Sequence, residues 1–263
     1  MAGLIDTHCH LDAAEFDADR DAVVARAAAS GVSAIVVPAV ERANFGAVAA
    51  VCREFPGCVP AFGIHPMYVD RAREEDLDAL RETLAAGSAV AVGEIGLDGF
   101  VRDRDEARQA FYFAEQLKIA RDLELPVLLH VRRAVDAVLM HLRRIRVPGG
   151  IAHAFNGSRQ QAEEFIRLGF RLGFGGAMTS PRATRLRALA AALPLDSIVL
   201  ETDAPDIPPA WLLAAAADRP RNEPAELARI GAALAELRGV PVAEVVAATT
   251  RNAVATLPRL AAR

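Results

Sequence analysis

Two histidines stand close to the start of the chain, in the stretch "MAGLIDTHCHLD". Leu4 and Ile5 are typical of a short buried strand, and the side chains of a strand alternate between its two faces. His8 and His10 are therefore expected to point the same way, with Cys9 pointing away from them into the core. Two imidazoles on one face at the end of a strand can chelate a metal ion, although a polar turn that contains histidines would give the same pattern.

Further metal-binding side chains recur at the ends of other apolar, β-rich segments. Taken alone, a histidine at such a place is more often a buried core or capping residue than a ligand. Their joint placement is more specific than any one of them. Of the six histidines, only His141, which lies within a helical stretch, is not at a predicted strand end. The candidate ligands at the predicted strand ends are His8, His10, His65, Glu94, His130, His153 and Asp203.

Eight such segments are separated by amphipathic, helix-like stretches. The segments lack strict polar alternation, which is typical of parallel strands buried on both faces. We therefore predict an α/β fold, a (β/α)8 TIM-type barrel, as a single domain over residues 1–263. A doubly wound open sheet is the alternative, weakened by the absence of a GxGxxG motif after the first strand. The predicted strands cover residues 3–8, 33–39, 59–65, 89–96, 126–131, 149–155, 170–176 and 197–203.

Active sites of these barrels lie at the carboxyl ends of the strands, which is where the candidate ligands fall. Four imidazoles and two carboxylates exceed what one tetrahedral ion needs, so we expect two divalent ions. The first and eighth strands adjoin in a closed barrel, which places His8, His10 and Asp203 on one ion. His130 and His153 would bind the second ion, and Glu94 would bridge the two.

The composition argues against several classes of protein. The chain has 263 residues, 52% of them hydrophobic, and a formal net charge of −4, which argues against a broad basic nucleic-acid surface. It shows neither a signal-peptide pattern nor an uncharged apolar run long enough to span a membrane. Its three cysteines lack the spacing of a disulfide framework. We therefore expect a soluble cytoplasmic protein, a monomer, with no membrane partner.

The only lysine, Lys118, lies within a predicted helix, so a carbamylated lysine cannot bridge the metals at a strand end. The bridge must then be a carboxylate. Histidine and carboxylate ligands suit zinc, manganese, magnesium, iron or nickel, and the sequence does not choose among them.

Seven motifs in this order resemble the TatD family of metal-dependent hydrolases. The resemblance runs from residue 6 to about residue 255, and it departs from the common family pattern in two loops. Where many members show "GLDYY" and "ETDAPYL", this chain has "GLDGF" (96–100) and "ETDAPDIP" (201–208). The motifs are "DTHCHLD" (6–12), "GIHP" (63–66), "GEIGLD" (93–98), "PVLLHVR" (126–132), "HAFNGS" (153–158), "ETDAP" (201–205) and "RNEP" (221–224).

The resemblance implies a TIM-type barrel, a dinuclear metal site and hydrolytic activity, usually of the deoxyribonuclease type. It also places a histidine, here His65, near the substrate phosphate. Six residues match the metal positions of the family one by one: His8, His10, Glu94, His130, His153 and Asp203.

From the residue types we expect Asp203 to act as general base through its second oxygen, and Glu94 to bridge. His65 and Arg132 would contact the phosphate oxygens, although Arg132 could equally be an exposed, salt-bridged arginine. Asp98 is expected to orient a ligand histidine. In "RNEP", Asn222 is expected to cap a helix, and a phosphate contact is the alternative considered for Arg221 beside it.

The favoured function is a phosphodiesterase that trims single-stranded or frayed DNA ends in the 3′–5′ direction. A barrel mouth is concave and admits a chain terminus more easily than an internal duplex phosphate. An amidohydrolase-type C–N or ester hydrolase acting on a small molecule is the second hypothesis. A metal-stabilised scaffold without turnover fits poorly, because it has no use for a free carboxylate oxygen beside a metal.

Overall fold

The computed structural model describes residues 3–216 and 218–260. Its strands form one sheet in the order β1 to β8, and every neighbouring pair is parallel. The predicted barrel is confirmed, and the strands are shorter than expected at several ends. They are β1 (Leu4–Asp6), β2 (Val32–Pro38), β3 (Cys58–Phe62), β4 (Ala91–Asp98), β5 (Val127–Arg132), β6 (Gly150–Ala152), β7 (Phe170–Phe174) and β8 (Ile198–Leu200).

The first and last strands meet where the sheet closes on itself. The backbone N–H of Thr7, one residue beyond β1, donates to the carbonyl of Leu200 at 3.1 Å, and its hydroxyl donates to the same oxygen. Next to this contact, the Asp6 carboxylate accepts hydrogen bonds from the backbone N–H and the hydroxyl of Thr202. The seam between β1 and β8 therefore depends on side chains as well as on the backbone.

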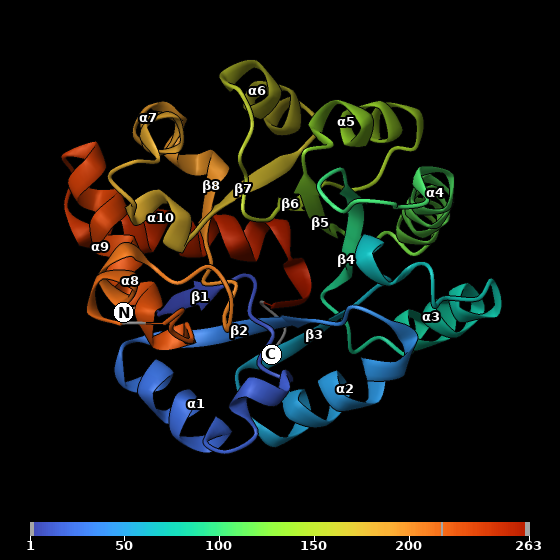
Figure 1. Cartoon of the computed structure of the whole chain (residues 1–263), viewed down its shortest axis with the longest axis horizontal. Helices are drawn as coiled ribbons and strands as arrows, with labels where there is room; N and C mark the ends of the chain where they lie inside the picture. The colour runs from blue at the N-terminus through green and yellow to red at the C-terminus, as the bar shows by residue number, and fades with distance from the viewer. Residues whose placement is uncertain (1–2, 217, 261–263) are drawn as a thin grey trace.

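Helices surround the strands as an outer ring, with α1 and α2 on one side and α5 and α6 opposite them (Figure 1). None of the helices in the described part of the chain is long and apolar enough to cross a membrane. The helices are α1 (Arg20–Ala29), α2 (Phe45–Glu54), α3 (Glu75–Ala85), α4 (Glu106–Asp122), α5 (Val135–Arg144), α6 (Arg159–Arg167), α7 (Thr184–Ala192), α8 (Ala210–Ala215), α9 (Leu227–Arg238) and α10 (Val242–Thr256).

The core has two layers, because neighbouring strand residues face opposite sides of the sheet. The larger layer packs between the strands and the ring of helices. The smaller one fills the barrel interior with one or two residues from most strands, together with Ala253 and Leu257 from the end of α10. Apolar side chains therefore fill the amino-terminal half of the barrel, and polar side chains are left to occupy the carboxyl-terminal half.

Candidate metal centre

Strand periodicity aims two of the histidines into the barrel. Leu128 lies in the interior layer, and His130 follows it two residues later on β5. Ile151 and His153 have the same relation at the end of β6, where His153 comes just after the strand. Each imidazole therefore points into the barrel, on the same side of its strand as an apolar side chain that lies nearer the amino end.

Glu94 does not end its strand, contrary to the expectation from the sequence. The strand β4 continues to Asp98, and the register against β5 shifts between Val92 and Ile95. Val92 and Ile95 both pack in the outer layer, although they are three residues apart. This β-bulge adds one residue to β4 and leaves Glu94 free to turn into the barrel.

One set of donor atoms gathers around oxygen Oε2 of Glu94. His8 Nε2 lies 3.1 Å and His10 Nε2 3.6 Å from this oxygen, and the two nitrogens are 3.3 Å apart. Oxygen Oδ1 of Asp203 lies 3.6 Å from His8 Nε2 and 3.8 Å from His10 Nε2. The three residues predicted to share one ion therefore lie together, although His8 and His10 follow β1 rather than end it.

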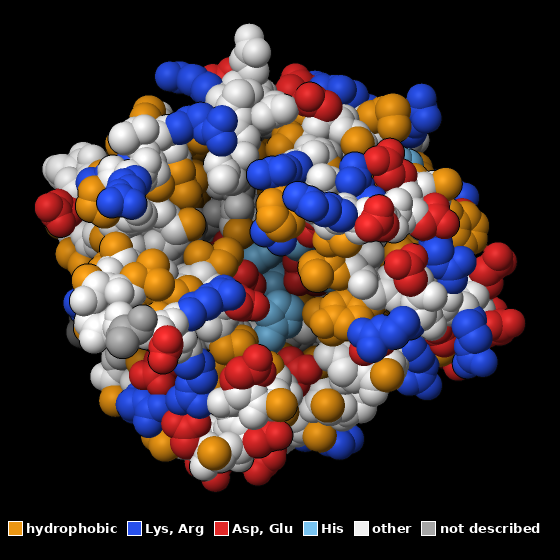
Figure 2. All heavy atoms as spheres, in the orientation of Figure 1, with side chains coloured by type: hydrophobic (Ala, Val, Ile, Leu, Met, Phe, Trp, Pro, Cys, Tyr) orange, Lys and Arg blue, Asp and Glu red, His pale blue; other side chains and the backbone are white. Residues whose placement is uncertain are grey.

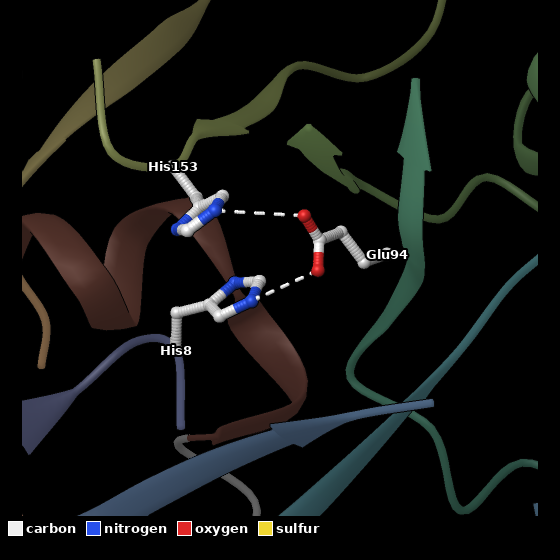
Figure 3. Close-up of side chains that lie close together, drawn as sticks. All are labelled: His8, Glu94 and His153. Carbon is white, nitrogen blue, oxygen red and sulfur yellow. Dashed lines mark hydrogen bonds and ion pairs between the residues drawn. The ribbon is translucent and has the colours of Figure 1, made fainter. Parts of the chain in front are cut away.

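A second set of donor atoms gathers around the other oxygen, Glu94 Oε1. His130 Nδ1 lies 2.9 Å, His153 Nε2 3.5 Å and His65 Nε2 3.5 Å from it. Figure 3 shows the Glu94 carboxylate facing His8 with one oxygen and His153 with the other. The rings of His8 and His153 stack with centroids 3.8 Å apart, so the two sets of donors adjoin.

Hydrogen bonds fix which ring nitrogen is available as a ligand. His130 Nε2 lies 2.9 Å from Asp98 Oδ2 and donates its proton there, which leaves Nδ1 directed at Glu94. His65 differs, because its Nδ1 accepts from the backbone N–H of Met67. The proton of neutral His65 is then on Nε2, which makes it a hydrogen-bond donor to an anion rather than a metal ligand.

Burial and charge set the protonation of the cluster in the absence of metal. Burial lowers the pKa of His8 to about 3 and that of His65 to about 4, so both rings are neutral at pH 7. Burial raises the pKa of Asp203 to about 6. For His153, burial acts in the opposite direction, but the carboxylates of Asp203 and Glu94 outweigh it and raise the pKa to about 10. The positive charge of His153 thus partly balances these carboxylates, a role that a bound cation can take over.

Glu201 is a polar residue of the site that the sequence interpretation missed. Val199 faces the barrel interior, so strand periodicity places Glu201 and Asp203 on the same inner side. Its Oε1 lies 3.4 Å from His153 Nδ1, and its Oε2 is buried without a hydrogen-bond partner among the described residues. A Cβ on Gly173 would meet this carboxylate at 2.1 Å, so only glycine leaves room for it.

The cluster lies at the bottom of a cavity of about 1020 Å³ at the carboxyl ends of the strands. Figure 2 shows histidines at the base of this hollow and basic side chains beside it. His65 and Arg132 both line the cavity. Arg132 is half exposed, and its nearest acidic atom, Asp98 Oδ2, is 4.0 Å away.

The "RNEP" residues have structural roles that differ from those expected. Arg221 binds both oxygens of Asp19 at 2.7 and 2.8 Å, which removes it from contact with a phosphate. Asn222 is fully buried and does not cap a helix. Its amide donates to the carbonyls of Thr202 and Asp206, at 2.8 and 2.9 Å, and so holds the loop that carries Asp203.

Comparison with known proteins agrees with this geometry. The family model "TatD related DNase" matches residues 5–258. The "Uncharacterized metal-dependent hydrolase YjjV" of Escherichia coli is 44% identical over 251 residues, which is 94% of this chain and 95% of that protein. The "3'-5' ssDNA/RNA exonuclease TatD" of Cronobacter sakazakii is 35% identical over 95% of this chain and 96% of its own length.

Solved structures extend the comparison to three dimensions. The crystal structure of YjjV from Escherichia coli superposes with a TM-score of 0.91 at 42% identity, covering 97% of this chain and 98% of that one. A TatD family hydrolase from Entamoeba histolytica, at 19% identity and a TM-score of 0.85, shares the fold. The chain therefore belongs to the TatD-related DNase family of metal-dependent hydrolases.

Proposed function

We propose that the protein is a two-metal phosphodiesterase that removes nucleotides from single-stranded or frayed DNA ends, in the 3′–5′ direction. The observation that carries the proposal is the Glu94 carboxylate, whose two oxygens face two separate groups of donor atoms. Glu94, shared by the two groups, would help to hold two cations. Paired ions suit phosphodiester hydrolysis, in which charge develops on both the attacking and the leaving oxygen.

The donor atoms fit a small divalent ion. A tetrahedral ion with bonds of about 2.1 Å holds its ligand atoms about 3.4 Å apart. Five separations among the donor atoms of His8, His10, Glu94 and Asp203 lie between 3.1 and 3.8 Å. This set would hold one ion, while His130 and His153 would hold the other with Glu94 shared between them.

When bound, two such ions would activate water at neutral pH and stabilise charge on the phosphate. The chain itself supplies proton transfer and orientation. Oδ1 of Asp203 faces His8 and His10, and its second carboxylate oxygen would accept a proton from water. His65 presents an N–H, and Arg132 a guanidinium, toward the non-bridging phosphate oxygens.

Access to the site favours a strand terminus over an internal phosphate. His8, Glu94 and His153 are buried and the cluster lies below the rim of the cavity, so an internal duplex phosphate would reach it only after strong bending. The net charge of −4 likewise gives no support to a broad duplex-binding face. The Cronobacter relative is named as an exonuclease on single-stranded DNA and RNA, which supports the same substrate class.

Covalently closed single-stranded circles provide the test, because they offer the same bonds without an end. The purified protein is loaded with manganese or zinc and given linear strands, circles of equal length, and a panel of cyclic amides. We expect release of nucleotides from linear strands and none from circles or amides. Degradation of circles at the linear rate would contradict end trimming, and hydrolysis of the amides alone would contradict the phosphodiesterase assignment.

A further inference from the structure

Phe100 is an unusual residue at the mouth of the cavity. It is a large apolar side chain that lines the cavity and yet remains 45% exposed. It belongs to "GLDGF", one of the two loops in which this chain departs from the common family pattern. A single exposed apolar side chain is common on a protein surface, so the case for a ligand depends on what surrounds the ring.

Two arginines pack against this ring. The guanidinium carbon of Arg132 lies 3.8 Å and that of Arg133 lies 4.6 Å from the ring centroid, and all three residues line the cavity. Among the described residues, Arg133 has no acidic partner, and Arg132 has only Asp98 at 4.0 Å. Their charge is therefore largely free to meet an anion, while Phe100 holds both guanidinium groups in place.

Gly99 allows this arrangement. Its backbone N–H donates to the Arg132 carbonyl at 2.6 Å, and a Cβ at position 99 would meet the Arg133 carbonyl oxygen at 2.5 Å. Any other residue would push the loop after β4 away from the end of β5. The glycine thus brings Phe100 onto the two arginines.

We propose that Phe100, Arg132 and Arg133 form a binding subsite for the nucleotide next to the scissile phosphate. The Arg133 guanidinium binds the phosphate of that nucleotide, while Arg132 stays with the scissile phosphate. The base stacks on the flat surface made by the phenyl ring and the guanidinium planes. Stacking on aromatic and guanidinium faces is the usual way in which single strands are bound without sequence preference. This inference rests on the proposed function and names the part of the substrate that the metal centre does not contact.

The first test measures kcat/KM for a hexathymidylate and for bis(p-nitrophenyl) phosphate, a phosphodiester without a neighbouring nucleotide. Phe100→Ala should lower the ratio of the two values about 10-fold, a typical effect of losing one base stack. Met67→Ala is the matched control, because Met67 is likewise an exposed apolar side chain at the same mouth but offers no aromatic ring to the arginines or to a base. It should leave the ratio within 2-fold of the wild type.

The second test measures binding without catalysis, by fluorescence anisotropy of a labelled hexathymidylate in EDTA. An abasic residue is placed at each of the three terminal positions in turn. At one position the wild type should lose about 10-fold in affinity while Phe100→Ala loses less than 2-fold, because the stacking partner is already missing. A neutral methylphosphonate beside that residue should likewise remove the effect of Arg133→Ala.

The outcomes separate this inference from the function on which it rests. If the wild type hydrolyses both substrates but the abasic and Phe100→Ala losses simply add at every position, the subsite is refuted and the phosphodiesterase remains. If the metal-loaded wild type hydrolyses neither substrate, the proposed function fails and the subsite fails with it.

Discussion

Asn222 permits a quantitative test of how the site is held together. In Asn222→Ala, the carbonyls of Thr202 and Asp206 lose their amide donor, and the backbone N–H of Glu223 loses the acceptor Oδ1 at 2.9 Å. Three hydrogen bonds, one of them buried and two partly buried, at roughly 1 kcal/mol each give a loss of about 3 kcal/mol in the free energy of unfolding. For a chain of this size that corresponds to about 6–12 °C in Tm.

Asn252, on α10, provides a matched control at the opposite end of β8. It is also buried, and its amide donates to the carbonyls of Leu195 and Ile198, at 2.8 and 2.7 Å. These carbonyls lie at the amino end of β8, opposite the site. Asn252→Ala should lose about 2 kcal/mol of stability but keep its metal content and its turnover.

Asn222→Ala should in contrast lose turnover well below its melting temperature, because the loop 202–207 that carries Asp203 is no longer fixed. Displacement of a ligand by about 1 Å is sufficient to reduce the rate about 100-fold. Urea unfolding and steady-state kinetics at 25 °C separate the two effects. If both variants lose stability and both keep full turnover, Asn222 does not position Asp203 and the reasoning is wrong.

Three further predictions concern the metal centre. Elemental analysis after dialysis should find that His8→Ala and His130→Ala each lose one ion, whereas Glu94→Ala weakens both; two tightly bound ions in Glu94→Ala would contradict the bridge. Asp98→Ala should reduce the affinity for the ion held by His130 about 10–100-fold, because the ring loses the carboxylate that orients it; an unchanged metal titration would exclude this role. Asp203→Asn should abolish cleavage with less effect on oligonucleotide binding, since it removes the base but keeps an oxygen donor; cleavage at the wild-type rate would assign proton transfer elsewhere.

Strand counting was sufficient to predict the barrel and to place most of the donor residues. Parallel strands end at one edge, so His130, His153 and Asp203 could be grouped without knowing any contact. The bulge in β4 could not be predicted, because it is defined by register against β5 and leaves the local pattern of "AVGEIGLD" unchanged. The result is that Glu94 was placed at a strand end, when it lies within the strand.

Glu201 and Asn222 were difficult for different reasons. Glu201 lies two residues after Val199, so strand periodicity could have identified it as facing the barrel interior. It was missed because Asp203, close by in the sequence, already supplied the carboxylate ligand expected from the eighth strand. The role of Asn222 depends on the path of the chain after β8, which brings Asn222 back to Thr202 from 20 residues further along the sequence. No short-range sequence pattern predicts a contact between residues so far apart in a loop.

The seam between β1 and β8 has a consequence for how the protein folds. Asp6 and Thr202, which meet there, are 196 residues apart, so closing the barrel at this seam has a high loop-closure entropy, which slows folding. His8, His10 and Asp203 lie directly above the seam. An ion held by them would act as a cross-link between the chain ends and would oppose opening of the barrel, by about 4 kcal/mol at a free concentration 1,000 times its dissociation constant. Metal supply would then control the lifetime of the folded protein as well as its activity.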